Sequence, residues 1–198
     1  MAELLLPASA QKELRRSQRG LQFGDFREAA KHLENAIKIY PKLAAAHHDL
    51  GVCYLRLREY EKAIAEFQEA SESDTHLSEP VISLAAVFYR LGRYPEGEAA
   101  ARRALALDPV NSRTRYLLGA ILAHEGRDDS ETIELLRDSR KGFPAAHLHL
   151  VCVLLRRHAT DEAVAELREY LQQPEVPEKD IVACMIERLR KASTCALK

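Results

Sequence analysis

The residues with the greatest capacity for chemistry in this chain are its histidines and cysteines. Four of them gather in one short segment: His147, His149, Cys152 and His158. His149 and Cys152 are three residues apart and would share one face of a helix, but a structural zinc site requires four ligands in a tetrahedron. His47 and His48 are adjacent, so on a helix they point in different directions and cannot share a metal. We therefore predict no metal site.

Catalysis requires a nucleophile with a base, paired carboxylates or metal ligands that converge on one point. The chain has no G-x-x-x-x-G-K-[ST] phosphate loop, no G-x-S-x-G nucleophile turn and no H-E-x-x-H zinc motif. We predict that the protein is not an enzyme, that it has no catalytic residues and that it uses no cofactors.

The charge balance and the cysteine pattern narrow the class of protein further. Lys and Arg total 29 against 30 Asp and Glu, so no basic surface for nucleic acid is indicated. The cysteines show no C-x-x-C spacing, and we interpret Cys53 and Cys152 as small buried side chains in a reducing compartment. No apolar run reaches the ~18 residues of a membrane-spanning helix. We expect a cytoplasmic protein; a periplasmic or other extracytoplasmic location stays open if the chain is an excised domain.

A sequence pattern of 34 residues recurs along the chain. Residues 44–75 read as two amphipathic helices in antiparallel succession, with a break near Arg58-Glu59. The same step relates three sets of positions: Leu50-Gly51, Leu84-Ala85 and Leu118-Gly119; Tyr54, Phe88 and Leu122; and Arg56, Arg90 and His124. Self-similarity at a fixed period of this length indicates an array of stacked helical repeats.

Small residues and prolines keep the same register. The small residues are Ser17, Gly51, Ala85 and Gly119 in the first helices and Ala29, Ala63, Gly97, Ala36, Ala70 and Ala104 in the second; the closing prolines are Pro41, Pro109 and Pro144. With this pattern the chain resembles the tetratricopeptide repeat (TPR) family over most of its length. The resemblance implies an all-α fold, a right-handed superhelical array of antiparallel helix pairs with a C-terminal capping helix.

On this register we expect a single domain, 1–198, with repeats at about 10–43, 44–77, 78–111, 112–146 and 147–173 and a capping helix at about 178–191. The first helix of the fifth repeat is apolar nearly all round, which predicts that neighbours cover both of its flanks. The last helix carries one apolar stripe that would cap the open edge of that repeat: Ile181, Val182, Met185, Ile186 and Leu189.

In the TPR family the first helices of successive repeats line a concave groove that binds peptide segments of partner proteins. The resemblance places these residues of the chain in the groove: His48, Asp49, Arg56, Tyr89, Arg90, Arg113, Tyr116 and His124. Arg56 and Arg90 hold equivalent positions, and two aligned guanidinium groups would bind carboxylates bidentately. The resemblance therefore implies a protein or peptide partner, one that is acidic if the arginines bind it. The alternative is that both arginines only offset the dipole at a helix end.

One TPR subclass grips acidic chaperone tails with a clamp of Lys and Asn. The corresponding positions here are Leu14, Gln18, Asp49, Glu79 and Ser83, so this clamp is absent. Our leading hypothesis is a scaffold or adaptor that holds a peptide segment in its groove. The alternative is a structural or spacer module of a larger, possibly exported bacterial protein or assembly, or a self-associating module. The oligomeric state stays open.

Overall fold

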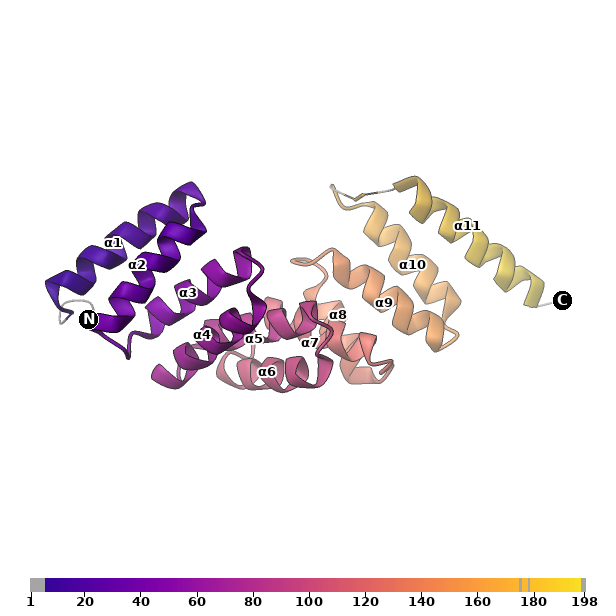
Figure 1. Ribbon diagram of the computed structural model, residues 1–198. Helices are drawn as coiled ribbons and strands as arrows, with labels where there is room; N and C mark the ends of the chain where they lie inside the picture. The colour runs from indigo at the N-terminus through magenta and orange to yellow at the C-terminus, as the bar shows by residue number, and fades with distance from the viewer. Residues whose placement is uncertain (1–5, 175, 178, 197–198) are drawn as a thin grey trace. The chain divides into compact units, whose positions relative to one another are not determined.

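The computed structural model describes residues 6–174, 176–177 and 179–196, and the regular structure in these residues is entirely α-helical (Figure 1). The helices are α1 (Ala8–Phe23), α2 (Phe26–Ile39), α3 (Ala44–Arg56), α4 (Tyr60–Ser73), α5 (Ser78–Arg90), α6 (Tyr94–Leu107), α7 (Ser112–His124), α8 (Ser130–Ser139), α9 (Ala145–Arg156), α10 (Thr160–Leu171) and α11 (Lys179–Ala196). Among the described residues, no helix combines the length and the apolar character that crossing a membrane requires.

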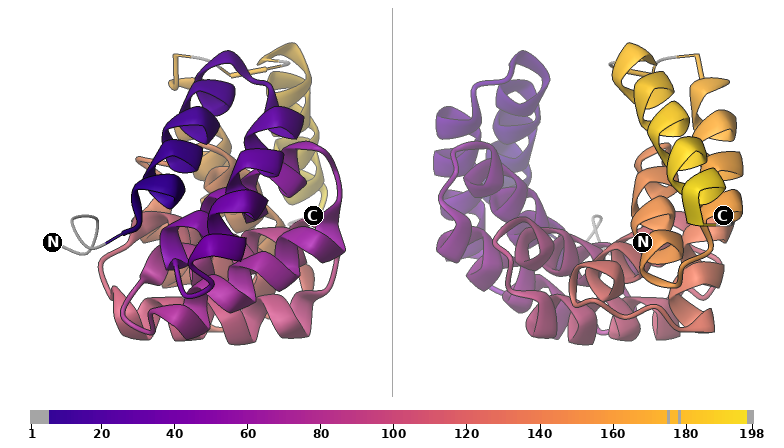
Figure 2. Two further views of the ribbon diagram at one scale, coloured as in Figure 1. Left: turned by 60° about the vertical axis from the view of Figure 1, so that its left-hand side comes forward. Right: turned by 90° about the vertical axis from the view of Figure 1, so that its right-hand side faces the viewer.

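The helices form two compact units. The first contains the residues up to 91 together with 106–108, and the second contains 92–105 and the residues from 109 onward. In the first unit α1 packs on α2, α2 on α3, α3 on α4 and α4 on α5. In the second unit α7 packs on α8 and α9, α8 on α9, α9 on α10, and α10 on α11, which runs alongside it in Figure 2.

The turn inside each hairpin contains a residue with left-handed backbone. Its φ angle is 74° at Gly24, 63° at Arg58, 71° at Gly92, 81° at Gly126 and 60° at His158. In four of these turns the next backbone N–H donates to the carbonyl oxygen five residues earlier, at 2.8–2.9 Å. This is the Schellman ending, which satisfies carbonyl groups that a helix end leaves unpaired. Each first helix therefore stops at a fixed point of the repeat.

Close approach of paired helices depends on glycine where the sequence keeps a small residue. A Cβ atom added to Gly51 would lie 2.6 Å from the ring of Phe67, which is completely buried. A Cβ atom on Gly119 would lie 3.0 Å from Leu136, also completely buried. The small positions of the 34-residue register thus let α3 approach α4 and α7 approach α8.

Neighbours pack on both flanks of α9, as predicted: α7 and α8 from the preceding hairpin and α10 from its own. They do not cover it on every side, because Leu148 is 39% exposed and Cys152 is also exposed, so the interpretation of Cys152 as a buried side chain is wrong. These two residues are four apart and share one face of α9. The helices that pack on α9 are α7, α8 and α10, and they leave this face uncovered.

The apolar stripe of α11 is only partly used in capping α10. Val182 and Ile186 are buried in the core of the second unit, and Leu189 packs against it half-buried. Ile181, which is 61% exposed, and Met185 lie on the outer flank of the helix. The stripe is wider than the surface that α10 presents, so its outer edge faces solvent.

Candidate functional site

Arg56 and Arg90, the two arginines predicted to bind a peptide, lie in equivalent surroundings in the first unit. Arg56 ends α3 and lies over the ring of Phe26, the first residue of α2, with the guanidinium carbon 5.8 Å from the ring centroid. Arg90 ends α5 and lies over the ring of Tyr60, the first residue of α4, at 5.6 Å. The last residue of one hairpin's first helix therefore stacks on the first residue of the preceding second helix.

These ring contacts leave the N–H donors of the two guanidinium groups without a hydrogen-bond partner among the described residues. Both arginines are exposed, and neither has an ion-pair partner among the described residues. A cation over a ring is attracted by the negative face of that ring, and this contact uses none of the guanidinium's hydrogen-bonding capacity for carboxylates. The rings therefore hold in place two groups of N–H donors of the kind that bind carboxylates.

The other predicted residues of the first unit are held by neighbouring side chains. His48 Nε2 lies 3.3 Å from Ser83 Oγ, and the His48 ring lies 5.5 Å from that of Phe67. Asp49 Oδ1 is 3.6 Å from His48 Nδ1. Tyr89 is half-buried next to Arg90. His48 thus joins α3 to α5, and Asp49 stays accessible beside it.

In the second unit the structure connects two of the three predicted residues through a third ring. His149 lies 5.3 Å from His124 and 6.0 Å from Tyr116, between ring centroids. His124 also stacks on Tyr94 at 5.3 Å with an interplanar angle of 12°, and Tyr116 stacks on Phe143 at 4.8 Å. We call Tyr94, His124, His149, Tyr116 and Phe143 the aromatic row.

The environment of the aromatic row favours uncharged rings. Burial, followed by the neighbouring His124, lowers the pKa of His149 to about 4, and burial raises the pKa of Tyr116. The predicted residue Arg113 is exposed in the first turn of α7 and makes no hydrogen bond, ion pair or ring contact with the described residues. Arg113 is therefore not a member of the row.

Sequence reasoning missed three members of the row, and one of them had a signal. Tyr94 follows Tyr60 by 34 residues and Phe26 by twice that step, so the stacking of His124 on Tyr94 repeats the contact of Arg90 with Tyr60. His149 was considered only as a zinc ligand. Phe143 lies in the turn before α9, where no periodic pattern marks it.

Acid–histidine pairs join the two helices of three hairpins. Glu13 Oε2 lies 2.6 Å from His32 Nδ1, between α1 and α2, and His47 Nδ1 lies 2.7 Å from Glu66 Oε2, between α3 and α4. The third pair is His147 and Glu166, between α9 and α10, with Nδ1 and Oε1 2.6 Å apart. The hydrogen bond from His32 is the main cause that lowers the pKa of Glu13.

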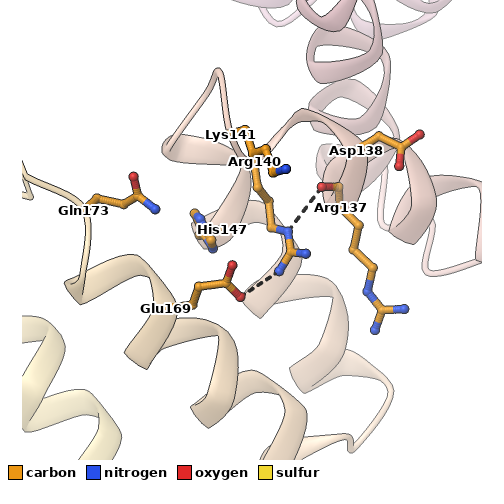
Figure 3. A pocket seen from close by; sticks show the side chains of 7 residues that line it. All are labelled: Arg137, Asp138, Arg140, Lys141, His147, Glu169 and Gln173. Carbon is orange, nitrogen blue, oxygen red and sulfur yellow. Dashed lines mark hydrogen bonds and ion pairs between the residues drawn. The ribbon is translucent and has the colours of Figure 1, made fainter.

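The third pair borders a cavity of about 280 Å³ that we call the α8–α10 pocket (Figure 3). Its lining residues are Arg137, Asp138, Arg140, Lys141, His147, Glu169 and Gln173. Arg140 Nη1 donates to both oxygens of Glu166, at 3.0 and 3.1 Å, and to Glu169 Oε2 at 2.9 Å. Arg140 Nε donates to the carbonyl oxygen of Arg137 at 3.2 Å. Arg140 thus lies at the centre of a charged network.

Three possible metal-binding residues meet at this pocket: ligand atoms of His147, Glu166 and Glu169 lie within 4.8 Å of one another. Both carboxylates, however, already accept hydrogen bonds from Arg140. A cation would have to displace or approach a fixed positive charge, so the arrangement does not suit a metal ion. Sequence reasoning missed the pair because the chain before α9 is short: His147 and Glu166 follow His47 and Glu66 by 100 residues, two fewer than three steps of 34. Helix α8 has 10 residues where α4 and α6 have 14.

Comparisons with known proteins give the family and the fold. Models of the tetratricopeptide repeat family match residues 21–87 and residues 83–146. Stress-induced-phosphoprotein 1 of Caenorhabditis elegans is 24% identical over 183 residues, which are 87% of this chain and 53% of that protein. The chain thus spans about half the length of this curated relative.

Three solved structures show the likeness of fold. A crystal structure of MamA protein has a TM-score of 0.76 at 21% identity and covers 85% of this chain and 98% of its own. YrrB, described as a TPR protein with an unusual peptide-binding site, has a TM-score of 0.74 at 17% identity. The match covers 89% of this chain and 90% of YrrB. The first TPR of Spaghetti (RPAP3), bound to the HSP90 peptide SRMEEVD, has a TM-score of 0.58 at 16% identity. The match covers 62% of this chain and 98% of that one. Together with the two family matches, they show that this chain is a TPR helical solenoid and belongs to the tetratricopeptide repeat family.

Proposed function

We propose that the chain is a binding scaffold that holds an acidic peptide segment of a partner protein, with Arg56 and Arg90 binding its carboxylates. The observation that carries this proposal is the shared state of these two residues. Both are exposed, both are stacked on an aromatic ring, and neither has an acidic partner among the described residues. A guanidinium oriented before binding loses little conformational entropy when a carboxylate binds.

The comparisons support a protein partner without identifying it. One structural neighbour was solved with the peptide SRMEEVD, which carries three acidic residues, and another is described as having a peptide-binding site. The Lys and Asn clamp of chaperone-tail binders is absent from this chain. If the chain binds an acidic segment, the contact therefore depends on Arg56 and Arg90, and the sequence it selects should differ from a chaperone tail.

The aromatic row supplies a second kind of contact in the second unit. Tyr116 is half-buried, and the neighbouring α9 exposes Leu148 and Cys152 on one face. Rings and thiol or aliphatic groups favour apolar side chains. We therefore infer that a segment bound at the second unit would carry apolar residues. Arg56 and Arg90 lie in the first unit and the aromatic row in the second, so each unit has a preference of its own.

The test is selection from a displayed library of random peptides, followed by titration of the enriched sequences. Wild-type protein should enrich sequences rich in Asp and Glu. The variant Arg56→Lys/Arg90→Lys keeps both charges but loses the forks, so it should bind these sequences about tenfold or more weakly. Arg56→Glu/Arg90→Glu should abolish binding, because it places like charges opposite the peptide.

A matched control distinguishes an effect of Arg56 and Arg90 from an effect of the protein's net charge. Arg27→Glu/Lys38→Glu makes the same change of charge on two exposed residues of α2 that have no ion-pair partner among the described residues. It should bind like wild type. Equal loss in both double variants would show that overall charge, not the paired arginines, governs binding. No enrichment by wild type would instead favour a spacer module.

A further inference from the structure

The α8–α10 pocket contains polar groups that no described residue uses. His147 is the most deeply placed of them, with 1% of its side chain exposed. Its Nδ1 bonds to Glu166, and Nε2 has no partner among the described residues. Since every fully buried side-chain polar atom of the described chain has a partner, Nε2 must reach the surface of the cavity. A buried imidazole nitrogen therefore faces an open space.

Two further groups of the lining have unused hydrogen-bonding capacity. The ammonium group of Lys141, next to Arg140, and the carboxamide of Gln173, which lies across from His147 in Figure 3, have no side-chain partner in the described chain. Both carry N–H donors. Glu166 occupies Nδ1 of His147, so Nε2 donates to the same space only when both ring nitrogens carry protons, a form that an anion bound there would favour.

The acidic side chains at the pocket, by contrast, all have cationic partners. Arg115 Nη1 donates to Asp138 Oδ2 at 3.1 Å. Arg140 binds both oxygens of Glu166 and one oxygen of Glu169. The guanidinium of Arg137 is directed to Glu162, at 3.0 Å, and its carbonyl oxygen accepts from Arg140. What remains unsatisfied is therefore mainly donor capacity together with the positive charge of Lys141. That balance suits a ligand made of acceptor oxygens with negative charge.

We propose that the α8–α10 pocket binds an oxyanion, either a phosphate or a carboxylate group, through Lys141, Gln173 and His147 Nε2. The volume of about 280 Å³ admits one such group with water and is too small to enclose a drug-sized molecule. The site lies at the turn between two hairpins of the second unit, and neither Arg56 nor Arg90 lines it. Its occupation therefore does not depend on the function proposed above.

The experiment follows the imidazole signals of the whole protein by NMR during titration with sodium phosphate, sodium acetate or sodium chloride at matched ionic strength. The His147 signal is identified by its absence from His147→Gln; if that variant does not fold, proximity to the Tyr170 ring, 5.9 Å away, identifies it instead. Phosphate or acetate should shift the His147 signal to saturation, and chloride should not. A response to phosphate alone would assign the site to phosphate; a response to acetate as well would include carboxylates.

Two variants test the assigned groups. Lys141→Ala should weaken the apparent affinity about tenfold, because it removes one charge-assisted hydrogen bond. Arg168→Ala removes a cation from the exposed surface of α10, outside the pocket, and should change nothing. The proposal is wrong if neither anion shifts the signal, if chloride shifts it equally, or if Lys141→Ala binds like wild type. It is also wrong if zinc chloride shifts His147 at concentrations where both anions have no effect, since the pocket would then be a metal site.

Discussion

His47 and Glu66 occupy the positions that Glu13 and His32 occupy one repeat earlier, with acid and base exchanged between the helices. Each residue lies 34 positions from its counterpart. The contact distances are nearly the same, 2.7 Å for His47–Glu66 and 2.6 Å for Glu13–His32. These two hairpins thus make the same contact between a carboxylate and an imidazole, whichever helix carries each.

This exchange predicts the result of a double-mutant cycle. His47→Glu places two carboxylates together and should lower the free energy of unfolding by roughly 2 kcal/mol. The double variant His47→Glu/Glu66→His should recover more than half of that loss. Recovery should be incomplete, because His47 Nε2 also bonds to the carbonyl oxygen of Pro41, at 2.8 Å. Urea denaturation of the four proteins measures the cycle; a double variant no more stable than His47→Glu would contradict it.

The left-handed turns predict two stabilising substitutions. Arg58 and His158 adopt φ angles of 63° and 60°, where the equivalent turns have glycine. Replacing either with glycine should raise the free energy of unfolding by about 0.5–1 kcal/mol, since a side chain is strained in this conformation. Arg58→Ala is the control: it removes the same side-chain charge but keeps the strain. If alanine stabilises as much as glycine, loss of charge is the cause instead.

The contact between α3 and α4 predicts a penalty at Gly51. A Cβ atom would lie 2.6 Å from the Phe67 ring, which has no room to move, so Gly51→Ala should cost roughly 1–3 kcal/mol. Gly119→Ala should cost less, because its nearest neighbour, Leu136, is 3.0 Å away. Thermal melts rank the two. In a Phe67→Leu background the cost of Gly51→Ala should shrink; an unchanged cost would place the clash elsewhere.

The aromatic row predicts a pH dependence with a defined sign. Burial holds the pKa of His149 at about 4, below the ~6.5 of an unfolded chain. As the pH falls, the unfolded chain takes up a proton first, so the stability from neutral His149 is complete above pH ~6.5 and is lost between about 6.5 and 4. Between pH 6.5 and 4 the free energy of unfolding of His149→Phe should therefore fall by about 1–2 kcal/mol less than that of wild type, a figure that allows for the partial exposure of His149. Parallel pH profiles of the two proteins would contradict the assignment.

Much of the fold could be predicted from the sequence because the repeat fixes its own register. The 34-residue step, with a small residue such as Gly51 wherever two helices touch, determines which helices pair. It also predicts that Arg56 and Arg90 share one environment. Their stacking on Phe26 and Tyr60 was not predicted, because it joins a helix end to a helix start thirty residues earlier, and such contacts leave no pattern within either helix.

The sequence was a poorer guide to the fifth repeat. The shorter α8 before it moved His147 and Glu166 out of the 34-residue step, so their equivalence to His47 and Glu66 was hidden. The exposure of Leu148 and Cys152 depends on which helices α9 contacts, and no residue of α9 itself encodes this. Whether the predicted groove residues bind a ligand stays a prediction for the same reason, since it depends on a molecule outside the chain.

The short reach of the side-chain contacts has a consequence for how the protein folds. The side-chain hydrogen bond between His48 and Ser83, for example, spans 35 residues, about one repeat. Closing such short loops costs little entropy, so folding should be rapid and should start in any hairpin. One hairpin then serves as the template for the next, and a repeat could be gained or lost during evolution without breaking contacts beyond its immediate neighbours.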